Sequence, residues 1–238
     1  MTKERAMAKK TLVFLFALLV LCSVRLSFAE EAVRPFRYLA IGNSITRHGI
    51  CEYWWNECGM AATSTEKDYV HQVAAYLEGL YPAVETTVLP FSVWETQPRD
   101  RSEAYTLLDE ALTAQPDLIT LQVSENVTRL REFSADYREL IACIREKCPQ
   151  AKLILVDDFW SARKSDIKRS AARDLHLPFA SLRAIRGDAA YQSETGAAVL
   201  GADGETHFIG SAAAARHPND AGMDFIAEAI ISQLQRLH

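Results

Sequence analysis

Short apolar runs alternate with amphipathic helical patterns along most of the chain, and this alternation limits the possible folds more than any other feature. Five strands are predicted by the apolar runs at 38–41, 86–89, 118–123, 152–156 and 179–182. Five helices are predicted by apolar residues at helical spacing over 68–80, 102–112, 134–147, 166–175 and 218–237. Alternating strands and helices of these lengths favour a parallel sheet with helices on both faces. We therefore expect an α/β fold with a parallel sheet of about five strands.

The first 29 residues differ from the rest and are interpreted as a secretory signal peptide. Basic residues near the start precede an apolar run from Leu12 to Val24, and a small-x-small triplet ends at Ala29. The apolar run is too short for a comfortable membrane span, and a buried N-terminal helix is the alternative. We expect cleavage after Ala29 and a secreted or periplasmic protein without a stable membrane anchor. Residues 30–238 then form a single domain.

The charge of the chain argues against a nucleic-acid partner. Five basic residues and one acidic residue lie before position 30, so residues 30–238 hold 21 basic and 30 acidic side chains and a formal charge of −9. Such a chain repels a polyanion on average. We therefore expect a small-molecule or polysaccharide substrate and no nucleic acid.

Residues 30–238 contain four cysteines, an even number that favours disulfides in an exported protein. Several pairings are possible, and local pairing of Cys51 with Cys58 and of Cys143 with Cys148 is preferred because short loops close easily. A metal site of Cys51, Cys58 and His48 is the weaker interpretation, since zinc sites usually have closer cysteine spacing. We expect neither a metal nor a cofactor.

Polar clusters follow three of the predicted strands. The tripeptide GNS at 42–44 follows the first strand, SEN at 124–126 follows the third, and two aspartates at 157–158 follow the fourth. In open parallel sheets, ligands bind outside the carboxyl ends of the strands, so these clusters are expected to share one site. The Gly/Ala-rich stretch 187–215 has poor periodicity and is expected to be an irregular excursion that carries part of the site.

Three residues of the chain have side chains that suit acyl transfer. Ser44 is the candidate nucleophile, and an unactivated serine needs a base. His217 is the best candidate base because it directly precedes Pro218, a good first residue of a helix. Asn126 is the candidate side-chain donor to an oxyanion, beside the backbone N–H of Ser44. Each residue alone suits an ordinary turn or surface position. Together they favour a serine hydrolase.

The same residues lie in motifs that resemble those of the SGNH/GDSL hydrolases. These motifs are "IGNSIT" at 41–46, "SEN" at 124–126 and "HPNDAGM" at 217–223, and the resemblance covers nearly the whole chain after the signal peptide. The family implies a flavodoxin-like three-layer α/β/α sandwich that hydrolyses esters of carbohydrates or lipids without a metal. Its nucleophile, oxyanion-hole asparagine and general base would correspond to Ser44, Asn126 and His217. The first and last motifs look most like a branch of exported bacterial proteins.

The sequence departs from the family pattern at two positions. The family usually carries an aspartate three residues before the histidine, where this chain has Ala214. Asp188, Asp203, Glu205 or a backbone carbonyl would then have to orient the imidazole. The glycine that lends a second oxyanion donor should fall within 91–94, which contains no glycine. Two alternatives to an esterase therefore stay open, a weakly active or inactive carbohydrate-binding protein on the same scaffold and an acyltransferase.

Aromatic and acidic side chains near the predicted site suggest a carbohydrate ester as the substrate. Aromatic faces stack on sugar rings, and all four tryptophans lie in or beside loops near this edge of the sheet, at Trp54, Trp55, Trp94 and Trp160. Half-buried loop anchors are the alternative. We predict substrate contacts from Trp94, Glu125 and Asp158, and capping of the following helix is the alternative for Asp158.

Overall fold

The structure is a computed structural model of the chain, and it describes residues 34–237. The predicted signal peptide and its cleavage site lie outside these residues. Within residues 34–237, no helix combines the length and the apolar character needed to cross a membrane.

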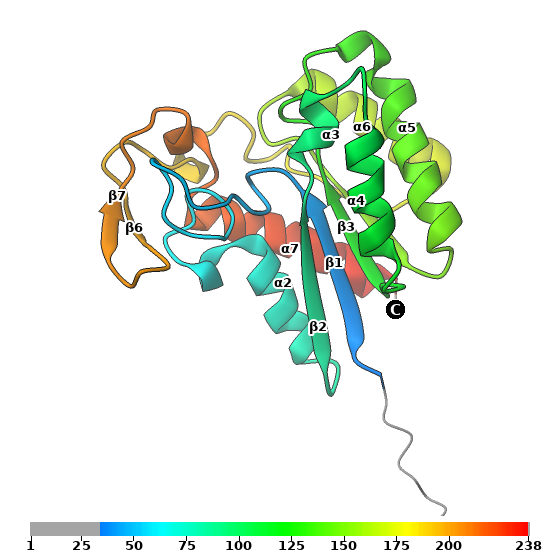
Figure 1. Cartoon of the computed structure of the whole chain (residues 1–238), viewed down its shortest axis with the longest axis horizontal. Helices are drawn as coiled ribbons and strands as arrows, with labels where there is room; N and C mark the ends of the chain where they lie inside the picture. The colour runs from blue at the N-terminus through cyan, green and yellow to red at the C-terminus, as the bar shows by residue number, and fades with distance from the viewer. Residues whose placement is uncertain (1–33, 238) are drawn as a thin grey trace, which may run out of the picture. The chain divides into compact units, whose positions relative to one another are not determined.

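Five parallel strands form the central sheet, and their carboxyl ends lie at one edge (Figure 1). In chain order they are β1 (Phe36–Gly42), β2 (Val84–Pro90), β3 (Leu118–Gln122), β4 (Lys152–Val156) and β5 (Phe179–Ala180). The strands lie in the order β2-β1-β3-β4-β5, and every pairing is parallel. This is the flavodoxin-like order, in which the chain reverses direction across the sheet between β1 and β3.

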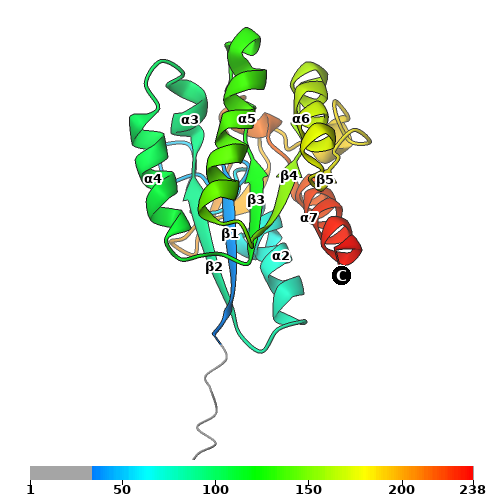
Figure 2. The same cartoon turned by 90° about the vertical axis from the view of Figure 1, so that its right-hand side faces the viewer.

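Helices cover both faces of the sheet and complete three layers (Figures 1 and 2). One face is covered by α2 (Tyr69–Glu78) and α7 (Asp220–Arg236), which pack against each other. The other face is covered by α4 (Ser102–Leu112), α5 (Leu130–Lys147) and α6 (Ala162–Leu175). The predicted α/β/α sandwich with a five-stranded parallel sheet is confirmed.

Alternating side chains of the strands supply two separate apolar cores. In β1, Tyr38 and Ala40 pack with α2 and α7, whereas Leu39 and Ile41 pack with the helices of the opposite face. Successive side chains of a strand point to opposite faces, so a strand that is covered on both sides is apolar throughout. This explains why continuous apolar runs located the central strands correctly.

The elements that sequence periodicity did not reveal are short. They are the helix α3 (Ser92–Thr96), the hairpin of β6 (Ala198–Leu200) and β7 (Thr206–Phe208), and the 3₁₀ turns η1 (Thr65–Lys67), η2 (Ala189–Tyr191) and η3 (Ala214–Arg216). A segment of three to five residues is too short to show a hydrophobic period. Much of the stretch 187–215 forms η2 and the β6–β7 hairpin.

All four cysteines of the described region are free thiols, so neither Cys51 with Cys58 nor Cys143 with Cys148 forms the predicted disulfide. The Cys58 thiol instead donates to the Gly59 carbonyl oxygen at 3.6 Å. Burial raises the pKa of the Cys58 thiol to about 12. Among residues 34–237, no group of three or more histidine, cysteine, aspartate or glutamate side chains is arranged to hold a metal, and this includes the cysteines near His48.

Candidate active site

Ser44 lies in a tight turn directly after β1. A Cβ atom on Gly42 would lie 1.8 Å from Thr46 Oγ1 and 2.7 Å from the Gln122 carbonyl oxygen, so no larger residue fits at the end of the strand. The Asn43 carbonyl oxygen accepts the backbone N–H of Thr46 at 3.0 Å, which closes the turn. Among residues 34–237, no acceptor pairs with the backbone N–H of Ser44. The turn thus presents both the hydroxyl and an unused amide of Ser44 at the edge of the sheet.

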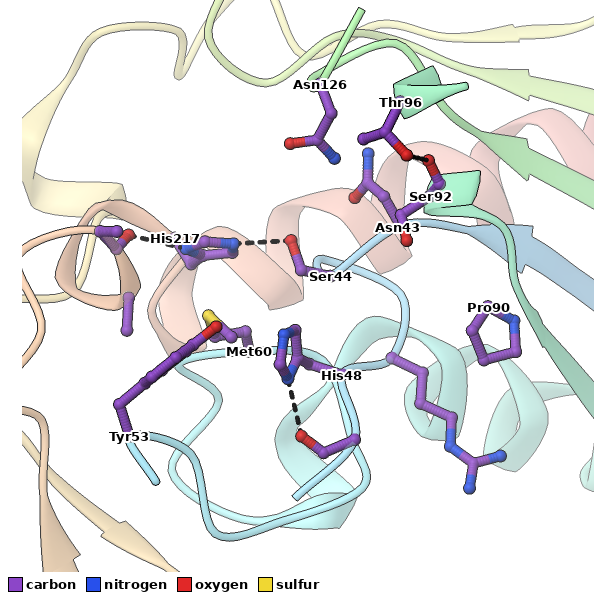
Figure 3. Close-up of a pocket in the computed structure, with 14 residues that line it drawn as sticks. Asn43, Ser44, His48, Tyr53, Met60, Pro90, Ser92, Thr96, Asn126 and His217 are labelled. Atoms are coloured by element: carbon purple, nitrogen blue, oxygen red, sulfur yellow. Dashed lines mark hydrogen bonds between the residues drawn. The ribbon is translucent and has the colours of Figure 1, made fainter. Parts of the chain in front are cut away.

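His217 lies between η3 and α7, and its ring connects Ser44 to a backbone carbonyl (Figure 3). Its Nε2 lies 2.8 Å from Ser44 Oγ, and its Nδ1 lies 3.0 Å from the carbonyl oxygen of Ala213. A carbonyl oxygen only accepts hydrogen bonds, so Nδ1 carries the hydrogen and donates it. The unprotonated Nε2 can therefore accept the hydroxyl proton of Ser44.

Burial sets the charge of this imidazole. His217 is 8% exposed, and burial lowers its pKa to about 4, although the hydrogen bond to the Ala213 carbonyl opposes the shift. The ring is consequently neutral at pH 7, as a general base must be.

None of the three acids proposed from the sequence reaches His217. Asp188 accepts the backbone N–H of Ala190 at 2.9 Å, and Asp203 lies 2.9 Å from His207 Nε2. The backbone N–H of Glu205 donates to Asp203 at 3.0 Å. Of the alternatives considered for Ala214, the backbone carbonyl is the one that the geometry provides.

Asn126, Ser44 and His217 share the wall of one pocket of about 430 Å³. Figure 3 shows the side-chain nitrogen of Asn126 on the side of Asn43. The remaining wall is formed by Asn43, Arg47, His48, Gly49, Tyr53, Met60, Pro90, Ser92, Thr96, Ala213 and Ala214. Three residues far apart in the chain therefore meet because the turns after β1 and β3 and the entrance to α7 lie at one edge of the sheet.

Several pocket residues escaped the sequence analysis because they lie in the irregular segment between β1 and α2. Tyr53 is 39% exposed, and its ring centroid lies 5.9 Å from that of His48. Met60 adds an apolar contact at the same wall. No periodic pattern or motif marks these positions in the sequence.

The predicted substrate contact of Trp94 is not available, because its side chain is fully buried. The ring packs edge-on against Phe133, with 6.5 Å between centroids, and the Arg101 guanidinium lies 4.3 Å above it. Trp54 is also fully buried. The alternative interpretation, in which tryptophans anchor loops, describes both residues.

The other two tryptophans are partly exposed and contact histidines. The Trp160 ring packs edge-on against His217 with 5.2 Å between centroids, and its Nε1 donates to the Arg216 carbonyl oxygen at 3.1 Å. Trp55 stacks on His207 with centroids 4.6 Å apart. Trp160 therefore supports the ring of the candidate base from the side.

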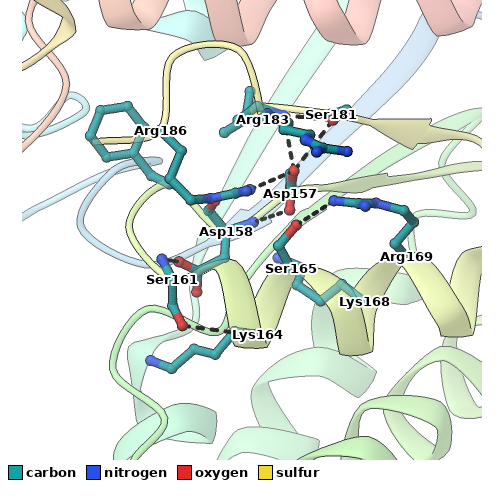
Figure 4. Close-up of polar contacts among 12 residues, drawn as sticks. Asp157, Asp158, Ser161, Lys164, Ser165, Lys168, Arg169, Ser181, Arg183 and Arg186 are labelled. Carbon is teal, nitrogen blue, oxygen red and sulfur yellow. Dashed lines mark hydrogen bonds and ion pairs between the residues drawn. The ribbon is translucent and has the colours of Figure 1, made fainter. Parts of the chain in front are cut away.

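Asp158 is also fully buried and does not line the pocket, so its carboxylate is not accessible for the predicted contact with substrate; Figure 4 shows its surroundings. Its Oδ1 accepts the backbone N–H of Trp160 at 2.9 Å and that of Ser161. Its Oδ2 accepts the hydroxyl of Ser124 at 2.7 Å. The carboxylate thus supports the turn that leads into α6, whereas the helix itself is capped by Ser161, whose side chain accepts the backbone N–H of Lys164.

Glu125 directs its carboxyl group away from the pocket. Its Oε2 accepts Asn43 Nδ2 at 2.7 Å, and its Oε1 accepts the backbone N–H of Phe159 at 3.0 Å. Burial, and then the nearby charge of Asp158, raise the pKa of Glu125 to about 8. Glu125 therefore connects the turns after β1, β3 and β4 and is not a substrate ligand in this geometry.

A buried lysine and a partly buried arginine complete the support beneath these turns (Figure 4). Lys168 is fully buried, and its Nζ donates to the Val123 carbonyl oxygen at 2.6 Å and to Ser124 Oγ at 3.3 Å. Arg186 donates to Asp157 Oδ2 at 2.7 Å. The ends of β3, β4 and β5 are thereby linked by charged hydrogen bonds.

Comparison with known proteins shows that the fold of this chain is similar to that of several solved structures. No protein-family model and no curated protein sequence matches the chain. A two-domain esterase active on acetylated mannans matches with a TM-score of 0.55 and 18% identity, over 85% of this chain and 50% of the esterase chain. This chain thus spans half the length of that esterase.

Two further solved structures are similar over most of this chain. A candidate GDSL-like lipase from Parabacteroides merdae matches with a TM-score of 0.54 and 17% identity, over 85% of this chain and 96% of the lipase. A salicylyl-acyltransferase from a tetracycline biosynthetic pathway matches with a TM-score of 0.52 and 17% identity, over 87% of this chain and 57% of the acyltransferase.

Proposed function

We propose that this protein is a serine ester hydrolase of the SGNH/GDSL type. The observation that carries the proposal is the 2.8 Å contact between Ser44 Oγ and His217 Nε2, in which the opposite ring nitrogen is committed to a backbone carbonyl. The motifs around Ser44, Asn126 and His217 and the fold shared with an esterase and a candidate lipase support the same class.

In the proposed reaction, Ser44 Oγ attacks the ester carbonyl carbon while His217 Nε2 takes the hydroxyl proton. The oxyanion that forms accepts the backbone N–H of Ser44 and a side-chain N–H of Asn126. His217 then gives its proton to the leaving alcohol, which leaves an acyl-enzyme on Ser44. Water, deprotonated by His217, attacks the acyl-enzyme, and release of the acid restores the serine hydroxyl.

The Ala213 carbonyl takes over part of the role of the usual triad acid. It fixes the orientation and the tautomer of His217, which are two of the tasks of a triad aspartate. A carbonyl is uncharged, so it stabilises the transient imidazolium less than a carboxylate does. The proposed enzyme therefore uses a Ser-His pair with a weak but already neutral base.

A carbohydrate ester is the proposed substrate, and the protein is proposed to act outside the cytoplasm after cleavage following Ala29. The N-terminal sequence pattern supports export. The fold shared with an esterase active on acetylated mannans supports an acylated carbohydrate. Tyr53 at the pocket wall offers a partly exposed aromatic ring for a sugar.

The test is hydrolysis of p-nitrophenyl acetate and labelling by a fluorophosphonate. We expect turnover and labelling of the wild-type protein, loss of both in Ser44→Ala, and a loss of at least about a thousandfold in turnover in His217→Ala. The exposed Ser102→Ala, in α4, is the matched control and should retain both. Wild-type protein without turnover or labelling would refute the esterase and favour a carbohydrate-binding protein. Turnover that survives in Ser44→Ala would assign the nucleophile elsewhere.

Acyl transfer is the second candidate, because an acyltransferase shares the fold. The acyl-enzyme on Ser44 would then react with a sugar hydroxyl in place of water. Incubation of the wild-type protein with an acyl donor and an acceptor sugar distinguishes the two. Acylated sugar in excess of free acid identifies a transferase, and free acid alone identifies a hydrolase.

A further inference from the structure

Glu95 is a buried carboxylate that the proposed mechanism does not use. It lies in α3, next to the fully buried Trp94, and is itself 1% exposed. Among residues 34–237, no lysine, arginine or histidine forms an ion pair with it. A carboxylate held away from water without a cation is costly unless hydrogen-bond donors surround it. The hydrogen-bond donors to Glu95 therefore indicate which parts of the site its carboxylate holds in place.

All four hydrogen bonds to Glu95 come from N–H groups of the two turns that form the candidate oxyanion site. Asn126 Nδ2 donates to Oε2 at 2.7 Å, and the backbone N–H of Asn126 donates to Oε1 at 3.4 Å. The backbone N–H of Ser124 also donates to Oε1, and Asn43 Nδ2 donates to it at 3.1 Å. One side chain from the segment after β2 thus holds the turn after β1 and the turn after β3.

The Asn126 contact determines which end of the amide faces the pocket. A carboxylate only accepts, so the amide must turn its nitrogen toward Glu95, and the carbonyl oxygen is excluded from that position. The side-chain nitrogen carries two hydrogens. One is bound by Glu95, and the second remains available to the pocket that Asn126 lines together with Asn43 and Ser44. Without Glu95, nothing in these contacts prevents the amide from turning its oxygen toward Ser44.

The contact between Glu95 and Asn43 also helps to fix the turn that contains the candidate nucleophile Ser44. Asn43 Nδ2 donates to Glu95 and to Glu125, and Asn43 Oδ1 accepts the backbone N–H of Ile45 at 3.1 Å. The Asn43 side chain therefore spans the turn that contains Ser44, and every polar atom of its amide is occupied.

The local backbone is strained where Glu95 binds it. Ser124 has a φ of 141°, a conformation that residues other than glycine rarely adopt. The Glu95 carboxylate holds its N–H, and Asp158 holds its hydroxyl at 2.7 Å. Strain of this kind persists only when surrounding contacts hold the backbone in place. Here those contacts hold the turn after β3, two residues before Asn126.

We propose that Glu95 is the positioning residue of the oxyanion site, and that its carboxylate fixes the Asn126 amide so that one N–H faces the oxyanion. Glu95 is absent from the pocket wall, so it acts through Asn126 and Asn43 and does not contact substrate. The inference rests on the proposed ester hydrolysis for its catalytic consequence. Its geometric part, the orientation of the Asn126 amide, can be measured without any turnover.

The kinetic test is a double-mutant cycle of Glu95→Gln and Asn126→Ala with p-nitrophenyl acetate. Loss of an oxyanion donor costs about 10²–10³ in kcat, and we expect Glu95→Gln to cost about 10–100-fold with KM within twofold of wild type. In the Asn126→Ala background, Glu95→Gln should cost less than about threefold, because the donor it positions is already missing. Equal factors in both backgrounds would overturn the inference.

Glu125→Gln is the matched control, because the Glu125 side chain also accepts Asn43 Nδ2 but, within residues 34–237, forms no hydrogen bond with Asn126. Its effect on kcat should be the same factor in the wild-type and Asn126→Ala backgrounds. Glu95→Asp serves if Glu95→Gln does not fold. It keeps the charge, withdraws the carboxylate by one methylene group, and should cost about tenfold in kcat with the same dependence on Asn126.

Nuclear magnetic resonance of the side-chain amides separates this inference from the esterase proposal. The Asn126 NH₂ signals are identified by their loss in Asn126→Ala. We expect the proton bound to Glu95 to be shifted downfield in wild type and to lose that shift in Glu95→Gln. Unchanged Asn126 signals in Glu95→Gln would overturn the inference even if the protein is an active esterase. Loss of the downfield shift in Glu95→Gln, in a protein without turnover, would support the inference while the esterase proposal fails.

Discussion

The imidazole of His217 is oriented by the backbone carbonyl of Ala213, which accepts its Nδ1–H at 3.0 Å. The carbonyl fixes the ring but brings no negative charge, so its hydrogen bond offsets only part of the effect of burial on the ring's protonation. Burial accordingly holds the pKa of His217 at about 4, below the usual value of a histidine.

The first prediction concerns the acid limb of the pH–rate profile. His217 accepts a proton only when neutral, and it is neutral above its pKa. We therefore expect kcat/KM for an uncharged ester to stay constant from pH 7 downward and to fall tenfold per pH unit only near pH 4. The measurement is kcat/KM from pH 3.5 to 8, with circular dichroism at each pH to confirm the fold. An acid limb near pH 6.5 would contradict the low pKa of His217.

A carboxylate introduced beside the ring should move that limb. Ala214→Asp places an acid three residues before His217, the spacing of the family motif. A nearby negative charge favours the imidazolium, so the acid limb is expected to move from about pH 4 toward the ordinary histidine range. Ala214 is buried, so a lower free energy of unfolding should accompany the change. Ala214→Asn is the control of equal shape, and an identical limb in both variants would refute the charge effect.

The central strands and long helices could be predicted because both faces of the sheet are covered, which makes the strands continuously apolar. Ser44, Asn126 and His217 could be singled out because each follows a strand or precedes a helix within a recognisable motif. The Ala213 carbonyl could be named only as one alternative, since every residue has a carbonyl and only the turn at η3 aims this one at the ring.

Other parts of the site have no sequence signal. Glu95 lies in a helix of five residues, which is too short for a hydrophobic period to be visible in the sequence. The burial of Glu95 and of Trp94 could therefore not be predicted. Trp94 was predicted to contact substrate because it is aromatic and close to a strand end, but the sequence does not show which way a loop side chain points. The inward direction of Glu125 depends on Asn43 and Phe159, which are distant in sequence.

We expect the titration of Glu125 to contribute to the pH dependence of the free energy of unfolding. Its pKa is raised from an ordinary value of 4.5 to about 8 by burial, so it is protonated in the folded state at pH 7 and ionised in the unfolded state. The folded state binds the extra proton between these two pKa values, so the contribution of Glu125 to stability is fully present below about pH 4.5 and is lost progressively as the pH rises to about 8.

Glu125→Gln should remove this dependence. Between pH 5 and pH 8, we expect wild type to lose at least about 1 kcal/mol more of its free energy of unfolding than the variant, since one pKa unit corresponds to about 1.4 kcal/mol. Urea unfolding at pH 5, 6.5 and 8 measures the difference. Glu139→Gln, an exposed change in α5, is the control and should follow wild type. Parallel pH dependences of wild type and Glu125→Gln would show that Glu125 is not protonated in the folded state.

The last prediction separates the buried lysine beneath the Asn126 turn from its exposed neighbour. Lys168 Nζ donates to the Val123 carbonyl oxygen and to Ser124 Oγ within a fully buried region, and a methionine of similar length supplies neither bond. We expect Lys168→Met to lower the free energy of unfolding by about 1–3 kcal/mol, because a buried carbonyl oxygen loses its donor.

Lys164→Met is the matched control, because Lys164 Nζ also donates to one backbone carbonyl oxygen, that of Glu125, at 2.8 Å. Lys164 is closer to solvent, and water can replace the lost donor, so its loss should be less than about 1 kcal/mol. Urea unfolding of both variants at pH 7 gives the comparison. Equal losses in the two variants would mean that burial of Lys168 adds nothing to its hydrogen bonds, and that the turn carrying Asn126 is held by Glu95 and Asp158 without it.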